Sequence, residues 1–362
     1  MANFGILGIG SHLPAEVRGN DWWPEAVVAR WRQRQGGSFA SPTGLVGDDG
    51  SALPEGARRI AEAIAADRDD PFQGVRERRI APDGTYASDM EVAAARAALQ
   101  RAAVDAAEID FVLSYSTCPD YLMAPNACAV HHKLGLRRDC LSLATEGACN
   151  SFLIQLALAE QLLAGGRFSR GLLVQSSMCS RLVPTDQPSS AILGDAATAV
   201  VVGRVAEGYG LLGRSHATDG THFNALAVGV PGRRWYEEGR NVFYAADKDV
   251  ARKLILSVAD RAREATGAAL ADAGLAARDV DFYASHQGTS WLRRVTQAHS
   301  GLDHARSFDT FPFAASVMGV NVPLVLALAE REGALVAGDL SVVFSGGLGE
   351  TWSSLVMRWG RG

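Results

Sequence analysis

The feature that most constrains the fold is a repeat inside the sequence. The pentapeptide LALAE occurs at 156–160 and again at 326–330, an offset of 170 residues. At the same offset, the apolar strand-like segment 171–176 aligns with 341–346, and further similar pairs occur in the same order. A single match could arise by chance, but an ordered series indicates an internal duplication. The sequence therefore predicts two similar α/β halves that meet near residue 205.

Each predicted half, 1–204 and 205–362, alternates strand and helix signals, which is typical of a mainly parallel sheet covered by helices. The segments 150–164 and 322–334 are apolar on nearly every face. Helices of that kind lie between other layers. Two such helices back to back, each flanked by a sheet, predict a five-layer αβαβα sandwich.

Two shorter signals add local detail. Ser88, followed three residues later by Glu91, has the pattern of a capping box, which predicts a helix that opens there and runs to about residue 104. The stretch 33–70 is rich in Gly, Pro, Ser and acidic residues and contains a helix-like segment at 55–66. We therefore predict that this stretch is an insertion or cap outside the common core.

Composition and charge exclude several functional classes. Hydrophobic residues make up 48% of the chain, charged residues make up 21%, and the formal net charge is -5. These values exclude a polybasic nucleic-acid binder and an intrinsically disordered chain. The sequence has no apolar run long enough to span a membrane, and its start lacks the basic region of a signal peptide. We therefore expect a cytoplasmic protein with neither membrane nor nucleic acid as a partner.

Cys149 is the strongest candidate for a nucleophile because of its place in the chain. It directly precedes the apolar helix predicted at 150–164. A thiol at a helix N-terminus lies near the positive end of the helix dipole and near unpaired N–H groups, and both favour the thiolate. The alternative is a small buried core cysteine, which is how most cysteines are used. The other four cysteines lie in or beside apolar segments and are interpreted as structural.

His286 is the candidate base. The segment 281–285 has the pattern of a strand, and His286 follows its C-terminal end. In parallel α/β sheets, ligand-binding and catalytic groups gather at those ends. A histidine of a surface loop is the alternative, because hydrogen-bonding reach to a thiol is a property of the fold rather than of the sequence.

A metal site is not indicated. Cys128, His131 and His132 have spacings that place two ligands on the same side of a helix, but no second cluster completes a tetrahedral site. We therefore expect no metal.

An ordered set of short motifs runs almost from end to end of the chain. They are GIGSHLP at 8–14, GVRERRIA at 74–81, TCPDYL at 117–122, AC at 148–149, GDAA at 194–197, SHQ at 285–287 and SGG at 345–347. Each is modest alone, but as a set they resemble the ketosynthase III branch of the thiolase superfamily, the condensing enzymes that include β-ketoacyl-ACP synthase III. Internal duplication is a hallmark of the thiolase fold. The resemblance therefore implies a thiolase-like version of the same five-layer sandwich.

The resemblance also implies a mechanism and partners. By the family pattern, Cys149 takes an acyl group from an acyl-CoA or acyl-carrier-protein thioester, and backbone N–H groups form the oxyanion hole. A His–Asn pair, with His286 at the His position, then stabilises the enolate formed when a malonyl thioester loses carbon dioxide. Gly347 falls in a substrate-binding motif. The family uses no bound cofactor, and it implies an acyl carrier protein as partner and a homodimer.

The chain departs from this pattern at the Asn. Counted thirty residues on from His286, or seven back from Pro323, that position holds Ser316. A serine hydroxyl is shorter than an amide and does not reproduce its reach. Loss of one oxyanion donor lowers a rate by about 10²–10³. Ordinary decarboxylative condensation is therefore in doubt.

Three functions stay open. The favoured one is an acyltransferase of specialised-metabolite biosynthesis, which passes an acyl group from Cys149 to a small-molecule or carrier-bound acceptor. The transfer is either a non-standard Claisen-type condensation or a transfer to oxygen or nitrogen with His286 as base. The alternatives are a standard β-ketoacyl-ACP synthase III and a noncatalytic partner subunit of a ketosynthase heterodimer. Retention of both Cys149 and His286 argues against the last.

Further departures concern the donor and the acyl group. The resemblance places the family's CoA-binding Arg at Phe72, so the usual adenine platform is missing and a carrier-protein thioester is favoured over CoA. The bulky Phe that closes the acyl pocket across the dimer falls at Ala124, and a small residue there permits a larger acyl group. Arg293 and Arg294, just past His286, are candidates for docking an acidic carrier protein. A solvated helix face is the alternative for this pair.

Overall fold

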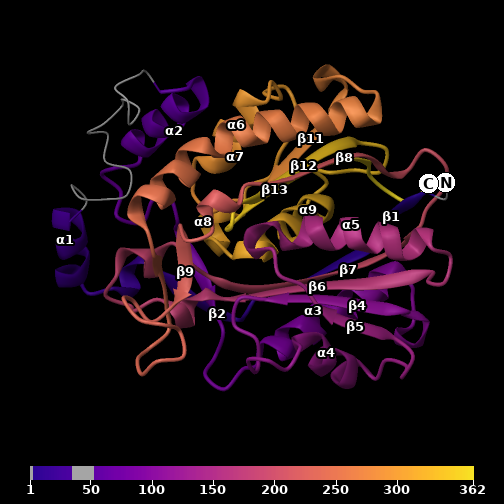
Figure 1. Ribbon diagram of the computed structural model, residues 1–362, viewed down its shortest axis with the longest axis horizontal. Helices are drawn as coiled ribbons and strands as arrows, with labels where there is room; N and C mark the ends of the chain where they lie inside the picture. The colour runs from indigo at the N-terminus through magenta and orange to yellow at the C-terminus, as the bar shows by residue number, and fades with distance from the viewer. Residues whose placement is uncertain (1–2, 35–52) are drawn as a thin grey trace.

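Helices and sheets alternate in layers across the molecule. The computed structural model describes residues 3–34 and 53–362. Figure 1 shows α3 and α4 on one side, then a sheet, then α5 and α9, a second sheet, and finally α6 with α7. Apolar clusters fill the space on both faces of each sheet. The five-layer sandwich predicted from the sequence is therefore confirmed.

The first sheet has five strands in the order β1-β7-β6-β4-β5. β4 pairs in parallel with β5 and β6, whereas β7 pairs antiparallel with β1 and β6. All five strands come from the chain before residue 205. Their bounds are β1 Phe4–His12, β4 Phe111–Ser116, β5 Leu141–Ala144, β6 Arg170–Met178 and β7 Asp195–Arg204.

The second sheet repeats the first. It has four strands, and starting from β8 their order is β8-β13-β12-β11. This order matches β1-β7-β6-β4, and the pairing directions match as well, because β13 is antiparallel to β8 and β12 while β11 is parallel to β12. The duplication inferred from the LALAE repeat is therefore confirmed. The bounds are β8 Gly210–Thr218, β11 Phe282–Ser285, β12 Leu340–Gly347 and β13 Thr351–Arg358.

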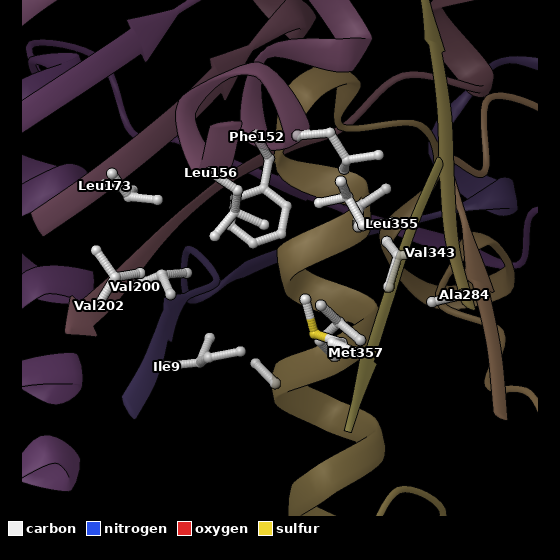
Figure 2. Packing of buried hydrophobic residues seen from close by; sticks show 14 of the residues in the cluster. Ile9, Phe152, Leu156, Leu173, Val200, Val202, Ala284, Val343, Leu355 and Met357 are labelled. Carbon is white, nitrogen blue, oxygen red and sulfur yellow. The ribbon is translucent and has the colours of Figure 1, made fainter. Parts of the chain in front are cut away.

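The two copies of LALAE lie in the middle layer. One copy is in α5 (Ser151–Ala164) and the other is in α9 (Asn321–Arg331), and both helices lie between the sheets (Figure 1). Phe152 of α5 shares one apolar cluster with Val200 of the first sheet and Val343 of the second, part of which Figure 2 shows. α9 is buried along most of its length, whereas Leu158 of α5 is 40% exposed. The prediction of a helix apolar on all sides therefore fits α9 more closely.

The outer layers cover the far faces of the sheets. α3 (Ala87–Ala102) and α4 (Asn126–Leu134) lie on the first sheet, and α6 (Lys248–Ala273) and α7 (Leu292–His299) lie on the second. Equivalent glycines allow α3 and α6 to approach. A Cβ on Gly8 would lie 2.8 Å from the carbonyl oxygen of Ala98, and one on Gly213 would lie 2.3 Å from that of Ala269.

The start of α3 differs from the sequence prediction. The helix begins at Ala87, and the side chain of Asp89 accepts a hydrogen bond of 3.1 Å from the backbone N–H of Tyr86. Glu91, the acidic partner in the predicted capping box, is fully buried instead. The predicted helix is confirmed, but its predicted cap is wrong, because Glu91 faces the sheet.

The helix predicted at 55–66 is α2 (Glu55–Ala66). Its Ile60 is fully buried against Ala259 of α6 and Trp291, which directly precedes α7. Residues 35–52 of the predicted insertion lie outside the described residues. The described part of the insertion therefore extends the outer helical layer of the second half.

The remaining elements are short. Two-stranded sheets join β2 to β3 and β9 to β10. In the described part of the chain, each helix is too short or too polar to cross a membrane. The bounds are α1 Glu25–Arg34, α8 Phe311–Ala314, β2 Glu16–Gly19, β3 Glu77–Ile80, β9 Leu226–Gly229 and β10 Val242–Ala245.

Candidate active site

Cys149 lies in a short helical turn, Ala148–Asn150, that leads into α5. The second half of the chain holds this turn in place. Ser345 Oγ donates a hydrogen bond of 2.7 Å to the carbonyl oxygen of Cys149. A Cβ on Gly347 would lie 2.3 Å from the carbonyl oxygen of Gly147, so only a glycine at the end of β12 permits the approach. Both halves therefore build the surroundings of the thiol.

The thiol of Cys149 is removed from water. The side chain is 7% exposed. Burial raises the pKa of the thiol to about 12; the residue's own backbone N–H lowers it, and the charge of Glu146 raises it further. We expected the helix N-terminus to favour the thiolate, but that prediction is wrong for the resting site, because desolvation outweighs it. The apolar cluster around the thiol contains Cys179, Val183, Leu193 and Met318.

His286 immediately follows β11, at the C-terminal end of a strand in a parallel pair, as predicted. Its backbone N–H donates to the carbonyl oxygen of Phe344 at 3.0 Å. The imidazole is 8% exposed, and its Nδ1 has no hydrogen-bond partner among the described residues. Burial lowers the pKa of the imidazole to about 4, although a hydrogen bond with the backbone of Met318 opposes this. At pH 7 the ring is therefore neutral and able to accept a proton.

Met318 brings the thiol and the imidazole together. Its Sδ lies 3.8 Å from Sγ of Cys149, and its backbone interacts with the ring of His286. Within the described residues, no hydrogen bond joins Cys149 directly to His286. Sequence reasoning missed Met318, because methionine is an ordinary core residue and its contact with Cys149 spans 169 positions. The candidate nucleophile and the candidate base therefore both contact one methionine.

Ser316 lies two residues before Met318 and is 3% exposed. Its backbone is tied to the segment that precedes β7. The N–H donates to the carbonyl oxygen of Ile192, and the carbonyl oxygen accepts from the N–H of Gly194, both at 3.0 Å. Among the residues that the structure describes, the hydroxyl makes no hydrogen bond to either candidate group. Ser316 is thus close in sequence to Met318, and hydrogen bonds hold its backbone in place.

The structure treats the three predicted substrate-binding residues differently. Gly347 adjoins the turn of Cys149, as described above. Ala124 lies on an exposed loop before α4. Phe72 packs against Trp23 and Trp31, with ring centroids 5.9 and 6.2 Å apart, in a separate aromatic cluster. Within one chain, Gly347 is therefore the member of this set that lies against the turn carrying Cys149.

The two arginines predicted to dock a carrier protein also differ. Arg293 donates to both carboxylate oxygens of Asp309, at 2.8 and 2.7 Å, and to Gln297 at 2.8 Å. Arg294, the next residue on α7, is exposed. Arg294 rather than Arg293 is therefore available to an acidic partner.

The residues weighed as metal ligands do not form a cluster. Cys128 is exposed on α4, and a ring nitrogen of His131 bonds to the carbonyl oxygen of Arg137 at 2.8 Å. Across residues 3–34 and 53–362, no three His, Cys, Asp or Glu side chains are arranged to hold a metal ion.

Comparisons with known proteins place this chain in a family. The family model for 3-oxoacyl-[acyl-carrier-protein (ACP)] synthase III matches residues 144–220, which include Cys149. The model for the C-terminal part of the same family matches residues 270–359, which include His286. The β-ketoacyl-[acyl-carrier-protein] synthase III of Syntrophomonas wolfei is 30% identical over 298 residues, which are 80% of this chain and 87% of the relative. The chain belongs to the β-ketoacyl-ACP synthase III family.

Other members of the β-ketoacyl-ACP synthase III family agree in sequence and fold. The relative from Bradyrhizobium diazoefficiens is 31% identical over 328 residues, covering 86% of this chain and 97% of its own. The crystal structure of 3-oxoacyl-(acyl carrier protein) synthase III from Pseudomonas aeruginosa matches with a TM-score of 0.77 and 25% identity, over 99% of this chain and 98% of that one. The predicted thiolase-like fold is therefore confirmed, and the protein is an acyltransferase of the thiolase superfamily.

Proposed function

We propose that this family member is an acyltransferase of a specialised-metabolite pathway. Cys149 takes an acyl group from an acyl-ACP or acyl-CoA thioester and passes it to an acceptor, with His286 as the base. The acceptor attacks through carbon, in a non-standard Claisen-type condensation, or through oxygen or nitrogen. One observation carries the proposal: a buried thiol and a buried neutral imidazole meet at Met318, while Ser316 occupies the position of the family's Asn.

Acylation starts from a neutral thiol and a neutral imidazole. The pKa of Cys149 is raised to about 12 and that of His286 is lowered to about 4, so at pH 7 the proton is on sulfur and the ring can accept it. As Sγ attacks the thioester carbon, the new Sγ–C bond forms and the donor C–S bond breaks. The thiol proton passes through His286 to the departing thiolate. We assign the oxyanion to the backbone N–H groups of Cys149 and Gly347.

The second half-reaction depends on Ser316. Decarboxylation of a malonyl thioester needs donors that stabilise the enolate oxygen, and the family places an Asn amide beside the His for this purpose. Ser316 has the shorter side chain, and two backbone hydrogen bonds, to Ile192 and Gly194, hold its main chain in place. An oxygen or nitrogen acceptor needs only a base for its proton, which neutral His286 supplies.

Standard decarboxylative condensation is the second candidate function. It is favoured by the relatives, which carry the name β-ketoacyl-ACP synthase III at 30% and 31% identity. A noncatalytic subunit is disfavoured, because Cys149 and His286 are both present and both are held by the second half.

We propose an acyl carrier protein as the donor. Phe72, at the position of the family's CoA-binding Arg, is part of an aromatic cluster and offers no positive charge to a phosphate. Arg294 is exposed on the helix that follows His286 and offers a positive charge to an acidic carrier. The acyl chain then lies against the apolar cluster around Cys149.

We also propose that two copies of the chain form the homodimer that the resemblance implies. The loop 121–123 carries three large apolar side chains that are 64%, 66% and 102% exposed. In the same half, β5 is an edge strand with Leu141 and Leu143 exposed. An open strand edge flanked by exposed apolar side chains favours a protein partner. In such a dimer, Ala124 approaches the acyl pocket of the partner.

The test is intact-protein mass spectrometry after incubation with a panel of acyl-ACP and acyl-CoA donors. We expect a mass increase whose size identifies the acyl group. Cys149→Ala removes the increase, whereas the matched control Cys140→Ala, a buried cysteine of a different apolar cluster, retains it. The proposal is contradicted by an adduct that persists in Cys149→Ala, or by the lack of an adduct with every donor.

A further inference from the structure

Met318 contacts both of the groups that an acceptor has to reach. In acyl transfer, the acceptor atom must reach the acyl carbon on Sγ of Cys149 and pass its proton to His286. In the described chain, Met318 contacts both groups, with Sδ 3.8 Å from Sγ and its backbone bonded to the imidazole. An acceptor must therefore meet this thioether or displace it.

The backbone around Met318 cannot retreat easily. The φ angle of Met318 is +51°, a strained conformation for a residue other than glycine. The side chain of Asn321 accepts a hydrogen bond of 3.3 Å from the N–H of Val317. A Cβ on Gly319 would lie 2.8 Å from the carbonyl oxygen of Ala148, so this residue is already in close contact. Close packing on both sides therefore fixes the position of the Met318 backbone.

The side chain of Met318, in contrast, can move. Methionine is unbranched, with several rotatable bonds, and its thioether adapts to irregular space. Met318 is 9% exposed, Cys149 is 7% exposed and His286 is 8% exposed, so each residue keeps a small exposed surface. Rotation of a thioether makes room for a small acceptor more readily than for a bulky one.

We propose that Met318 selects the acceptor by size. The inference rests on the proposed acyl transfer and adds to it the residue that decides which nucleophile reaches the acyl-enzyme. The selected class is a slender nucleophile, such as a primary alcohol, amine or thiol on an unbranched chain. Met318 acts through the space it fills and exchanges no proton with the substrate.

The test compares two thiols of similar acidity and different size, 2-mercaptoethanol and benzyl mercaptan. Each is added to the acyl-enzyme, and its discharge is followed by mass spectrometry. In the reaction the new thioester C–S bond forms, the bond to Sγ breaks, and the proton of the incoming thiol passes through His286 to Sγ. We expect Met318→Ala to raise the ratio of the discharge rate with benzyl mercaptan to that with 2-mercaptoethanol by about tenfold. An effect of this size is typical when the volume of an apolar pocket changes.

Three variants serve as controls. Met318→Leu keeps the volume and is expected to keep the wild-type ratio of the two rates, and Met318→Val is expected to lie between Leu and Ala. Met357→Ala removes another buried methionine, in the central cluster shown in Figure 2, and is expected to lower stability without changing the ratio. Thermal unfolding verifies that each variant is folded.

The outcomes separate this inference from the proposed function. An acyl-enzyme whose rate ratio is the same in Met318→Ala and wild type overturns the inference alone. Lack of an acyl-enzyme in the wild type overturns the proposed function. In that case, alkylation of free Cys149 by iodoacetamide and by N-benzyliodoacetamide gives the same size comparison. Equal effects of Met318→Ala on both reagents then overturn the role of Met318 as well.

Discussion

Two turns that the duplication makes equivalent lie against each other at the site, and they differ in content. Ala148–Asn150 leads into α5, and Met318–Val320 leads into α9. At the LALAE offset of 170, Ala148 corresponds to Met318, and their φ angles are +48° and +51°. The next position is Cys149 in one turn and Gly319 in the other. The two copies of the turn share a backbone conformation but differ in side chains. One copy carries the thiol, and the other packs against the first.

The largest effect is expected from a side chain added where the turns touch. A Cβ at Gly319 would lie 2.8 Å from the carbonyl oxygen of Ala148 and 2.7 Å from Cε1 of Tyr115. Gly319→Ala must therefore displace the turn that carries Cys149. We expect acylation to slow by about 10²-fold and stability to fall by about 1–3 kcal/mol.

Gly267→Ala is the matched control for that variant. Gly267 lies inside α6, where a Cβ would meet nothing within 4 Å. Because glycine is unfavourable within a helix, alanine there is expected to stabilise the protein by about 0.5–1 kcal/mol and to leave acylation unchanged. Acylation rates and thermal unfolding of both variants provide the measurement. A wild-type rate in Gly319→Ala would mean that the two turns are not in functional contact.

The next effect concerns Ser316, which belongs to the same loop as Met318. Ser316→Asn restores the amide that the family uses beside the His. We expect it to raise carbon dioxide release from malonyl-ACP by about 10²-fold, the usual worth of one oxyanion donor. Ser316→Ala is the control and should stay at the wild-type level. Equal release from Asn and Ala variants would show that this position does not limit decarboxylation.

The pH dependence distinguishes the His286 loop from an exposed histidine. Since burial lowers the pKa of His286 to about 4, the base stays deprotonated across the neutral range. We expect the acyl-transfer rate to be constant from about pH 8 down to about pH 6 and to fall as the pH approaches 4. Rates measured by quenched mass spectrometry test this, with buffer controls for stability. A decline centred near pH 6.5 contradicts the buried, neutral imidazole.

The smallest effect compares the two outer layers. Glu91 on α3 is fully buried and accepts hydrogen bonds from Asn126 at 2.6 Å and Ser176 at 2.7 Å, whereas the buried residues of α6 are uncharged. Burial raises the pKa of Glu91 to about 8. The folded protein therefore holds more protons than the unfolded chain between the unperturbed pKa and about 8, and stability falls as pH rises through that window.

Glu91→Gln removes this titration. Relative to wild type, the variant is expected to be more stable at about pH 8.5 than at about pH 5, by at least about 1 kcal/mol. Urea unfolding at the two pH values measures the difference. A stability difference between variant and wild type that is the same at both pH values contradicts the buried, protonated carboxyl.

The layered architecture was predictable from the sequence because each half of the chain repeats the same order of strands and helices. The LALAE offset and the paired strand segments identified α5, α9, β6 and β12 before any geometry was known, and the helix at 55–66 followed from local pattern alone. The cap of α3 was misplaced because Glu91 fits a local capping pattern, while its side chain is taken up by Asn126 and Ser176. Tertiary packing determines where the Glu91 side chain lies, and a local capping pattern contains no information about that packing.

The candidate site was predictable only in part. Cys149 and His286 were recognisable from their places at a helix start and a strand end. Met318 was not, because its role arises from a contact between turns in different halves. The thiol pKa was also mispredicted, since the sequence shows the helix start and not the apolar cluster that encloses it. Burial and contact between distant segments are properties of the assembled layers.

In the proposed reaction, acyl-Cys149 passes its acyl group on without ordinary malonyl decarboxylation. The most direct measurement is to form the acyl-enzyme, add malonyl-ACP, and follow both loss of the adduct and release of carbon dioxide. We expect carbon dioxide to stay at the level of Cys149→Ala and the adduct to persist until a competent acceptor takes the acyl group. Loss of the adduct in step with carbon dioxide release would contradict the proposed reaction and identify a standard β-ketoacyl-ACP synthase III.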